Sequence, residues 1–409
     1  METNKKELII LTKLKDDVKQ QLLNVYNHPK VVGKTIAFPD CHLGKGIPIG
    51  CLAILDNAIS PNMVGSDIGC GVLSCQLRIK KSFFTLDEWK EIASEIRKKV
   101  PMGFNWQKEA TEHCIYDNQP TGTIYMQHRK EVELQLGTLG GGNHFIEFET
   151  DEDNFVWLTI HCGSRNIGKI VNEYYDKLAQ EHMKVIGNEE LSIQGLSYLE
   201  KNEMSEYLTD MHSCISFAHH NRRKIRNTIL EIIGEKMRNK LDCVAYDGEY
   251  DWDISDEIVL DTYSSVHNYA KWGGDGKQYI HRKGCVDMLE HIQTWSGCWE
   301  NTSYGSVIVG SQGTCSYIVK PTEFAKEVEN TCSHGAGRVL GRGEAKRTLS
   351  LEKELEILNK QGIIHALRGK DQLDEATSAY KDIEKVIAEQ KKYIKIIKKL
   401  KPFMVLKGN

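Results

Sequence analysis

The sequence predicts an α+β protein in which a strand-rich core is decorated by helices within a single large domain, residues 1–409. Three observations lead to this prediction. Short apolar runs broken by Gly, Pro and Asp fill residues 31–80. Amphipathic stretches with helical spacing come later in the chain. No fixed-period repeat and no Pro/Ser-rich linker divides the sequence, although its length would allow two or three ordinary domains.

The first half of the chain is expected to form most of the core. Residues 31–80 are interpreted as strands and turns, and residues 86–99, "LDEWKEIASEIRKK", repeat apolar side chains at helical spacing. Strands return at "NHFIEFE" and "NFVWLTIHCGS", the second of which runs into a histidine and a Gly-Ser turn.

The second half adds helices around that core. A helical insertion is expected at about 168–240, and short strands and loops at about 242–320. A helical C-terminal part is expected at about 344–400, including the lysine-rich stretch "YKDIEKVIAEQKKYIKIIKKLK".

Composition limits the classes of function. The formal net charge of -4 excludes a globally basic nucleic-acid binder, so such a site would be a local patch. The N-terminus lacks a signal peptide and no apolar run approaches the ~20 residues of a membrane span. The twelve cysteines are scattered without a CxxC pair, which indicates a reducing compartment. A cytoplasmic protein without a membrane partner is predicted.

Five glycine-rich segments carry His, Asp, Cys or Asn, mostly just after apolar runs, where a rigid sheet positions loop chemistry. They are "FPDCHLGKG" (38–46), "GSDIGCGV" (65–72), "GTLGGGNHFIE" (137–147), "IHCGSRNIG" (160–168) and "CSHGAGRVLGRG" (332–343). Four histidines, His144, His161, His267 and His334, have Gly or Asn within two residues, in strand-to-loop settings. Each alone is more simply a structural histidine, but together with Asp67 and Cys70 they form a candidate metal site.

The residue types of this candidate site leave several metals open. Imidazoles accept Zn, Mn, Fe, Co or Ni, a carboxylate suits harder ions and a thiolate softer ones. Asp67 and Cys70 are three residues apart, so a carboxylate or thiolate could bridge two ions, as in phosphoryl-transfer sites. A structural zinc is the alternative, weakened by the lack of closely spaced cysteine pairs.

The stretch "SHGAGR" (333–338) is typical of a phosphate cradle. Its glycines would let backbone N–H groups approach a phosphate, Arg338 could grip it in a bidentate way, and His334 could attack phosphorus. "GTLGGGN" does not match a Walker motif, so a P-loop ATPase is not supported. Ser311 and Ser316 in "GSQGTCSY" are either phosphate or base contacts or ordinary turn residues.

Eight motifs in order resemble the RtcB-type RNA ligases, over nearly the whole chain from about residue 30. These motifs are "PDCHLGKG", "VGSDIGCG", "GTLGGGNHFIE", "HCGSRNIG", "VHNYA", "HRKG", "GSQGTCSYIV" and "SHGAGR", and the terminal "VLKGN" is also similar. The resemblance implies an RNA ligase that uses GTP as co-substrate and two Mn²⁺ ions. Such an enzyme joins an RNA 3′-phosphate, or a 2′,3′-cyclic phosphate after opening, to a 5′-hydroxyl end through a histidine–GMP intermediate.

The resemblance also implies roles for individual residues. His334 looks like the guanylylated nucleophile, Asp67 and His144 like ligands of one ion, His161 and His267 like ligands of the other, and Cys70 like the bridge between them. The residues that resemble guanylate contacts are Asn143, Glu147, Ser311, Ser316, Gly335, Ala336, Gly337, Arg338, Tyr380 and Lys407. Arg165 resembles a residue that holds the RNA end or the triphosphate. Candidates for contact with the RNA backbone are Lys45, Asn221, Arg222, Arg282 and Lys283.

Small departures indicate a divergent subgroup, which leaves the RNA substrate and the need for an activating protein factor open. Cys41 and Cys162 stand where valine and serine are common in the family, Gln312 where methionine is common, and Gly141 and Gly142 enrich one loop in glycine. Two other functions remain to be weighed. The same site could serve a binuclear metal phosphoesterase acting on RNA 3′-phosphate ends, or hold a structural metal in a non-catalytic RNA-binding or chaperone-associated protein.

Overall fold

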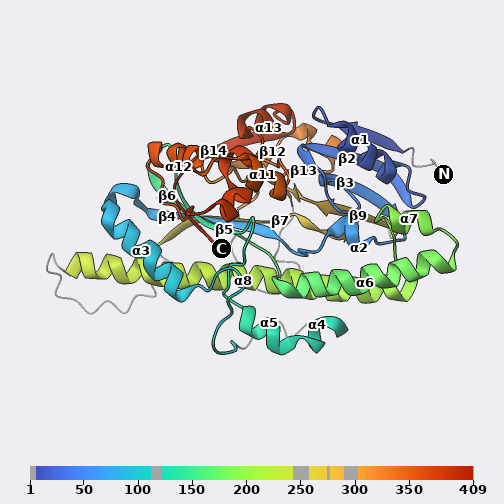
Figure 1. Ribbon diagram of the computed structural model, residues 1–409, viewed down its shortest axis with the longest axis horizontal. Helices are drawn as coiled ribbons and strands as arrows, with labels where there is room; N and C mark the ends of the chain where they lie inside the picture. The colour runs from blue at the N-terminus through green and yellow to red at the C-terminus, as the bar shows by residue number, and fades with distance from the viewer. Residues whose placement is uncertain (1–5, 112–120, 243–257, 274–276, 290–302, 409) are drawn as a thin grey trace.

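Two sheets form the centre of the structure, a computed structural model that describes residues 6–111, 121–242, 258–273, 277–289 and 303–408 (Figure 1). The strands of the larger sheet, in order across it, are β11 (Ser306–Ile308), β12 (Ser316–Pro321), β14 (Ile394–Lys407), β5 (Phe145–Thr150), β6 (Phe155–Cys162), β4 (Gly71–Lys80) and β7 (Val259–Val266). The smaller sheet has the order β1 (Glu7–Ile10), β2 (Val31–His42), β3 (Ile49–Asp56), β9 (Gln278–Lys283) and β8 (Asn268–Trp272). A short ribbon pairs β10 (Cys285–Asp287) with β13 (Thr331–Ser333). The strand-rich core expected from the sequence is confirmed.

Local sequence signals account well for the helix that follows β4. Helix α3 (Leu86–Lys99) begins after Thr85, whose hydroxyl accepts a hydrogen bond from the Glu88 N–H while the Glu88 carboxylate accepts one from the Thr85 N–H. This reciprocal cap satisfies two backbone donors that the first turn leaves unpaired. The helix predicted at 86–99 is therefore confirmed with the same bounds.

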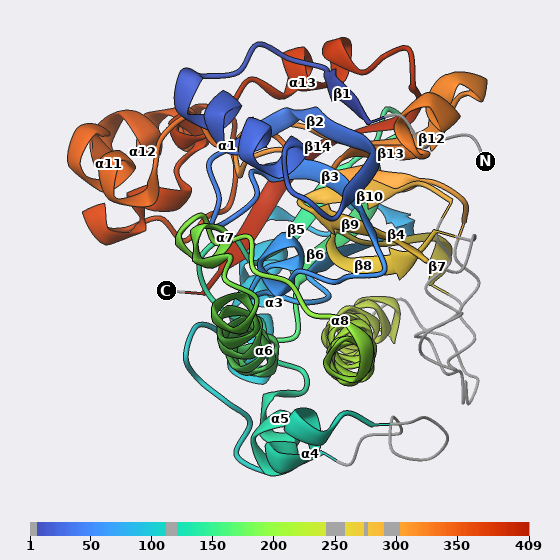
Figure 2. The same ribbon diagram turned by 90° about the vertical axis from the view of Figure 1, so that its right-hand side faces the viewer.

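The predicted insertion forms helices, and the last of them packs against β6 and β4 of the larger sheet. They are α6 (Asn166–Val185), α7 (Glu189–Ile193) and α8 (Lys201–Asp242). Figure 2 shows α6 and α8 side by side beneath the strands, with α4 (Thr123–Gln127) and α5 (Arg129–Gln135) on their far side. Apolar side chains of α8, among them Ile225 and Ile229, share one buried cluster with Leu73 and Ile160 of the sheet. This packing fixes α8 directly under the strands that carry the candidate site.

The remaining helices are short and lie toward the two chain ends. They are α1 (Asp16–Tyr26), α2 (Pro61–Val64), η1 (Lys81–Phe83), η3 (Glu323–Val328), α11 (Arg342–Thr348), α12 (Leu351–Lys360), η4 (Lys370–Glu375), η5 (Thr377–Ala379) and α13 (Ile383–Glu389), where η marks a 3₁₀ helix. None of the helices in the described ranges has the length and apolar character needed to cross a membrane.

One expected helix is wrong in its last part. The helical C-terminal part predicted at about 344–400 is helical only as far as α13, because the chain from Ile394 onward is the strand β14. This strand fills the slot between β12 and β5, where both of its edges find backbone partners. The ladder hydrogen bonds and the β-branched isoleucines of "IKIIKK" favour the strand over the helix that the apolar spacing indicates.

Candidate functional site

Five of the predicted site residues meet at one edge of the larger sheet. Because β5, β6, β4 and β7 are neighbours and antiparallel, the start of one strand lies beside the end of the next. His144 immediately precedes β5, His161 lies near the end of β6, Cys70 immediately precedes β4, and His267 immediately follows β7. Pairing of Gly71 with both Cys162 and Val266 brings these strand ends into register.

The loop "GSDIGCG" is held tightly against its neighbours. The Cys70 N–H donates to the Asp67 carbonyl at 3.1 Å, and the His267 N–H donates to the Cys70 carbonyl at 2.9 Å. Gly69 has a φ of +73°, and a Cβ there would lie 2.8 Å from the Cα of Ile215 on α8. A larger residue at this position would therefore strain the backbone and push the loop away from the helix. The glycines allow the close approach that places both side chains in the site.

The side chains converge as two overlapping groups that share one thiol. The first contains Asp67, Cys70 and His144, and the second contains Cys70, His161 and His267; within each group the ligand atoms lie within 4.8 Å of one another. Cys70 Sγ lies 3.6 Å from His144 Nε2 and 3.3 Å from His161 Nε2, while His144 Nε2 lies 2.9 Å from Asp67 Oδ2. This arrangement can hold two cations with the Cys70 sulfur between them.

The chemistry of the donor set fits divalent metal ions. Burial lowers the pKa of His161 and of His267 well below the usual range, which keeps both imidazoles in the neutral form that binds metal. His161 Nδ1–H donates to the Asn143 carbonyl at 3.1 Å, so its Nε2 lone pair faces Cys70. Burial raises the pKa of the Cys70 thiol to about 12, and a bound cation would supply the charge that ionises it.

His334 stands next to this cluster and is oriented by a buried carboxylate. Its ring centroid lies 4.7 Å from that of His267, and its Nδ1 lies 2.7 Å from Asp40 Oδ2. Burial alone would raise the pKa of the Asp40 carboxyl, but the hydrogen bond from His334 outweighs this and holds the pKa below its usual range. An ionised Asp40 accepts the Nδ1–H, which leaves the Nε2 lone pair of His334 free to act as a nucleophile. Sequence reasoning quoted Asp40 in "FPDCHLGKG" but gave it no role.

A cavity of about 170 Å³ opens beside His334. Most of the candidate guanylate contacts line it: Asn143, Glu147, Ser311, Gly335, Ala336, Gly337, Arg338, Tyr380 and Lys407. Ser316 does not line this cavity. That side chain is fully buried, and its hydroxyl accepts a hydrogen bond from the Gly310 N–H. The geometry therefore argues for a structural role at Ser316.

Arg338 is occupied within the protein. Its guanidinium donates to the carboxylate of Glu375 at 3.1 Å and to the Asp374 carbonyl, and it stacks over the Tyr380 ring at 5.0 Å. Glu375 also lies 3.5 Å from Lys407 Nζ. The bidentate phosphate grip predicted for Arg338 is therefore not the arrangement seen here, because its three nitrogens already donate to Glu375, to the Asp374 carbonyl and to the Leu340 carbonyl. Glu375 had no motif around it that could have drawn attention to it.

Two glutamates on the same face of β5 are buried, Glu147 in the cavity wall and Glu149 two residues further along the strand. Among the described residues, Glu147 Oε1 has no hydrogen-bond partner, and Glu149 Oε2 accepts from the Thr159 hydroxyl at 2.7 Å. Burial raises the pKa of Glu149 to about 7, and burial together with the charge of Glu149 raises the pKa of Glu147 well above its usual range. Glu147 is thus an unpaired acceptor facing a cavity, which suits a ligand with N–H donors.

The raised pKa of Glu149 predicts a pH-dependent stability. Because the folded state holds this proton up to about pH 7 while the unfolded state loses it near 4.5, the free energy of unfolding should fall as pH rises between these values. We expect Glu149→Gln to be more stable than the wild type at pH 8 by roughly 1–3 kcal/mol, and to match it more closely at pH 4.5. Urea unfolding at both pH values measures this difference. The exposed Glu356→Gln on α12 is the control, and an equal gain there would contradict the assignment.

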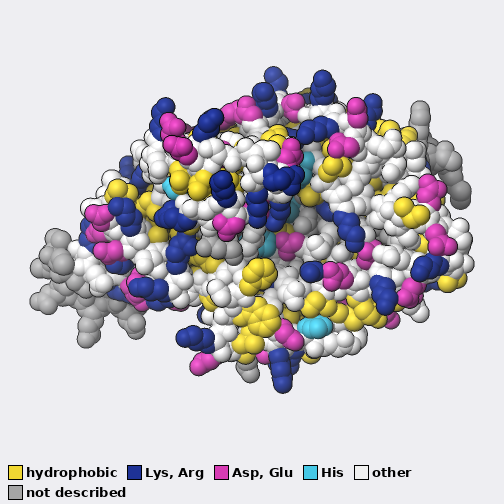
Figure 3. Space-filling model, viewed as in Figure 1, with side chains coloured by type: hydrophobic (Ala, Val, Ile, Leu, Met, Phe, Trp, Pro, Cys, Tyr) yellow, Lys and Arg dark blue, Asp and Glu magenta, His cyan; other side chains and the backbone are white. Residues whose placement is uncertain are grey.

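A second cavity, of about 800 Å³, adjoins the first. It reaches Asp67 and His144 and is also lined by Arg165, which is half-buried and donates to the Thr138 hydroxyl at 2.9 Å. The two cavities share Asn143 and Lys407 in their walls. Figure 3 shows Lys and Arg side chains gathered around a hollow in the middle of this face, with histidine visible inside it.

Four of the five candidates for RNA-backbone contact are buried, which counts against that prediction. Asn221 and Arg222 lie in α8 and Arg282 and Lys283 in β9, each no more than 8% exposed. Arg222 donates to the carbonyls of Gly69 and Cys162, and Lys283 donates to those of Lys45 and Asn62. Through these hydrogen bonds the side chains of Arg222 and Lys283 hold the backbone of the loops that carry the site. The side chain of Lys45 is largely exposed and pairs with Asp176, so for Lys45 RNA contact stays a prediction.

Removal of Asn221 should test this structural role. Its amide oxygen accepts from the N–H groups of Gly137 and Thr138, and its amide nitrogen donates to the Thr138 carbonyl. Asn221→Ala removes the acceptor of the Gly137 N–H, while the Thr138 N–H keeps the Gln135 carbonyl and the Thr138 carbonyl keeps the Cys162 thiol. We therefore expect a loss of roughly 1–3 kcal/mol in the free energy of unfolding. Denaturant unfolding measures it, with the exposed Lys224→Ala on the same helix as control. An unchanged stability with weaker RNA binding would instead restore Asn221 to the RNA contacts.

The departures from the family pattern lie close to the site. The Cys162 thiol is buried behind His144, 3.9 Å from its Nδ1, and receives a hydrogen bond from the Asn221 amide. The Gln312 amide donates to the Glu375 carbonyl at 2.8 Å and lines both cavities. Cys41 is buried in the core around α1. None of these residues displaces a member of the ligand cluster.

Comparison with known proteins agrees with the motifs. A family model described as tRNA-splicing ligase RtcB matches residues 21–120 and 107–408. The RNA-splicing ligase RtcB of Escherichia coli (strain K12) is 29% identical over 415 residues, which cover 96% of this chain and 94% of the relative. The tRNA-splicing ligase RtcB of Nanoarchaeum equitans is 28% identical over 98% of this chain and 93% of its own length. The RNA-splicing ligase RtcB homolog 1 of Entamoeba histolytica is 27% identical over 95% of this chain and 83% of its own length.

Proposed function

The chain belongs to the RtcB family, and from that premise we propose that it is an RNA ligase that joins RNA 3′-phosphate ends to 5′-hydroxyl ends with GTP and Mn²⁺. One observation carries the proposal. His334, oriented by Asp40, lies between the two groups of metal ligands that share Cys70 and the cavity of about 170 Å³. In the wall of that cavity, Glu147 Oε1 has no hydrogen-bond partner among the described residues. A nucleophile, a binding site for cations and a binding site for a nucleobase therefore lie next to one another.

The proposed reaction has three steps. His334 Nε2 attacks the α-phosphorus of GTP, so that a P–N bond forms and the bond to pyrophosphate breaks. An oxygen of the RNA 3′-phosphate then takes the guanylyl group, which breaks the P–N bond and leaves an RNA 3′-pp-G end. Finally the 5′-hydroxyl oxygen attacks the 3′-phosphorus, a phosphodiester forms, GMP leaves and the hydroxyl proton passes to solvent. A 2′,3′-cyclic phosphate would first be opened by water.

Different residues of the chain would hold the cations, orient His334, and contact guanine and phosphate. Asp67, Cys70 and His144 would hold one Mn²⁺, and Cys70, His161 and His267 the second; together the ions would neutralise phosphate charge. Asp40 keeps the Nδ1 proton on His334, so that the nucleophile presents an unprotonated Nε2. Glu147, when ionised, can accept from the N1–H and exocyclic amine of guanine, a donor pair that adenine does not present at the same edge. Lys407 lies at the junction of the two cavities and can meet a phosphate there.

Labelling with GTP tests the proposal most directly. We expect the wild-type protein, incubated with Mn²⁺ and α-³²P-labelled GTP, to acquire an acid-labile covalent label that labelled ATP does not give. The same protein should join an RNA with a 3′-phosphate to one with a 5′-hydroxyl. Release of inorganic phosphate from RNA 3′-phosphate ends without GTP, and no label, would instead favour the phosphoesterase.

Asp40 should matter for the first step although it is not a ligand. Asp40→Asn presents either an amide donor or a weaker acceptor to His334 Nδ1, so the imidazole loses the tautomer that leaves Nε2 free. A change of this kind in a Ser-His-Asp triad costs about 10⁴-fold in rate, so we expect label formation to slow by roughly 10²–10⁴-fold. Rapid-quench labelling measures this rate. Metal content should stay at the wild-type level, and a loss of metal in Asp40→Asn would contradict the assigned role.

A further inference from the structure

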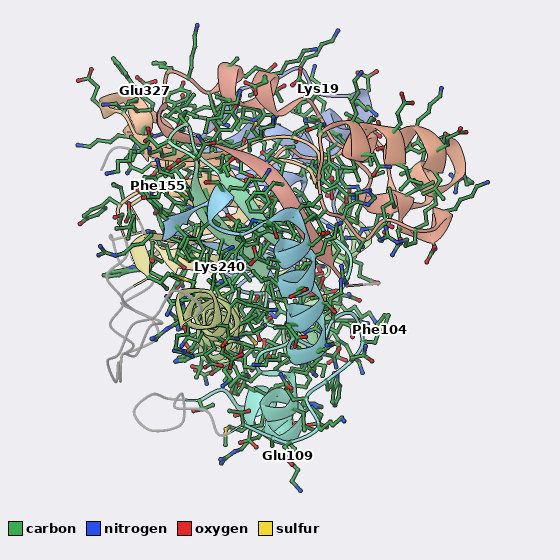
Figure 4. The ribbon with its side chains drawn as sticks, turned by 90° about the vertical axis from the view of Figure 1, so that its left-hand side faces the viewer. Lys19, Phe104, Glu109, Phe155, Lys240 and Glu327 are labelled. Carbon is green, nitrogen blue, oxygen red and sulfur yellow. The ribbon has the colours of Figure 1, made fainter. Side chains whose placement is uncertain are left out.

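Two aromatic side chains stand exposed at the larger cavity and take no part in the proposed chemistry. Phe104 is 97% exposed and Trp106 is 40% exposed, and both line the cavity that reaches Asp67 and His144. Among the described residues, neither belongs to a hydrophobic cluster of the core. Figure 4 shows Phe104 at the edge of the molecule, well away from Glu327. Packing of the fold therefore does not explain why these residues are aromatic.

The backbone holds Phe104 in a defined place. Residues 102–105 form a turn in which the Asn105 N–H donates to the Met102 carbonyl, and Gly103 takes a φ of +68°. The Gly103 N–H donates to the Gly140 carbonyl at 3.0 Å, and the Arg165 guanidinium donates to the Gly103 carbonyl at 2.8 Å. The turn is thus tied to the loop that carries His144. The backbone of the turn therefore sets where the Phe104 side chain starts relative to the ligand cluster.

Cations surround the aromatic pair. Arg165, Lys169, Arg342, Lys346 and Lys407 line the same cavity, and on its other side Phe104 lines a smaller hollow with Arg97 and Lys407. The carboxylates in the cavity wall are largely matched, since Glu375 lies near Arg338 and Lys407, and Asp374 near Lys346. Aromatic faces interspersed with Arg and Lys are the composition of sites for single-stranded nucleic acid.

We propose that Phe104 and Trp106 form a base-stacking platform for an unpaired RNA strand entering the cavity that leads to Asp67 and His144. This inference rests on the proposed function and sharpens its substrate. Inside a duplex both faces of a base are covered by its neighbours, so a strand that continues past Phe104 with a base stacked on the ring is unpaired at that base. The cations of the cavity then bind the phosphates of the same strand.

Binding of a labelled single-stranded RNA that ends in a 3′-phosphate tests the platform, with Mn²⁺ present and GTP absent. Phe104→Ala should weaken binding roughly 5- to 150-fold, which corresponds to about 1–3 kcal/mol per stacked base. Phe104→Tyr should bind nearly as tightly as the wild type, whereas Phe104→Leu, with similar bulk but no π face, should resemble Phe104→Ala. Because the Phe104 side chain is almost fully exposed, its truncation should leave the thermal unfolding curve unchanged.

Matched controls separate stacking from charge and from general surface effects. Trp272→Ala and Phe324→Ala each remove an exposed aromatic that does not line the cavity, on β8 and η3, and should leave RNA binding unchanged. Lys169→Ala should reduce the slope of log K against log salt, by about 0.7 for one phosphate contact on a single strand. Phe104→Ala should leave that slope unchanged. A smaller slope in Phe104→Ala would overturn the stacking assignment.

An abasic scan identifies the stacked nucleotide. One abasic residue is placed at successive positions near the 3′-phosphate end and near the 5′-hydroxyl end, and each RNA is bound to the wild type and to Phe104→Ala. At one position the abasic change should weaken binding to the wild type but not further weaken binding to Phe104→Ala. Losses that simply add at every position, or wild-type affinity in Phe104→Ala, would overturn the platform. A wild type that shows this coupling but no GTP label would leave the platform standing and reject the ligase mechanism.

Discussion

His334→Ala is expected to abolish both the covalent GMP label and the joining of RNA ends. The alanine has no nitrogen to form the P–N bond, and the two histidines His161 and His267 direct Nε2 into the ligand cluster instead. The loss should exceed the roughly 10²–10⁴-fold expected for Asp40→Asn, which retains the nucleophile. Labelling with GTP and gel analysis of joined RNA measure the two effects on the same protein.

The order of the proposed steps provides a stringent control for this variant. An RNA supplied with its 3′-phosphate already activated as 3′-pp-G has passed the steps that need the nucleophile. His334→Ala should therefore still join such an RNA to a 5′-hydroxyl strand, with Mn²⁺ and without GTP. Joining of an ordinary 3′-phosphate end by His334→Ala would show that another residue carries the guanylyl group. Failure with both substrates, at normal metal content, would mean that His334 also acts in the final step.

Sequence reasoning predicted those parts of the fold that depend on local signals. Thr85 and Glu88 cap α3 within one turn of chain, so the helix start can be read directly from the sequence. Strand β14 is different, since its isoleucines and lysines have helical spacing and only its partners β12 and β5, over 70 residues away along the chain, make it a strand. The error arose because nonlocal backbone pairing outweighed local periodicity.

In the candidate site, too, the features that depend on local sequence could be predicted, and those that depend on nonlocal contacts could not. The residues of the ligand cluster could be predicted because each lies near Gly or Asn close to a strand end, and the antiparallel order then brings the ends together. The pairing of Asp40 with His334 joins residues 294 positions apart and leaves no pattern in the sequence. Likewise Asn221 and Arg222 occur in the basic run "NRRK", which is typical of an exposed surface, yet both are turned inward to hold loops of the site. Burial of a polar residue cannot be seen from its neighbours in sequence.

Cys70→Ala is expected to remove both metal ions and with them the GMP label. Each group of ligands consists of three residues, and Cys70 is the one they share, so its loss leaves Asp67 with His144 and His161 with His267. Two ligands bind a divalent ion far more weakly than three, and the loss at each centre should exceed the 10–100-fold that follows removal of an outer-shell partner. Metal analysis after gel filtration in Mn²⁺ buffer measures the occupancy, and thermal unfolding checks that the fold is retained.

Single-histidine variants make the sharing of the thiol testable. His267→Ala removes a ligand from one group only, so one ion should remain on Asp67, Cys70 and His144, and His144→Ala should leave one ion on the other group. Cys75→Ala, which removes another buried thiol from β4, should keep both ions. If Cys70→Ala retained one ion, the thiol would serve a single centre, and the two groups would be independent sites. A loss of both ions from Cys70→Ala, against one from each histidine variant, is the pattern that only a shared sulfur produces.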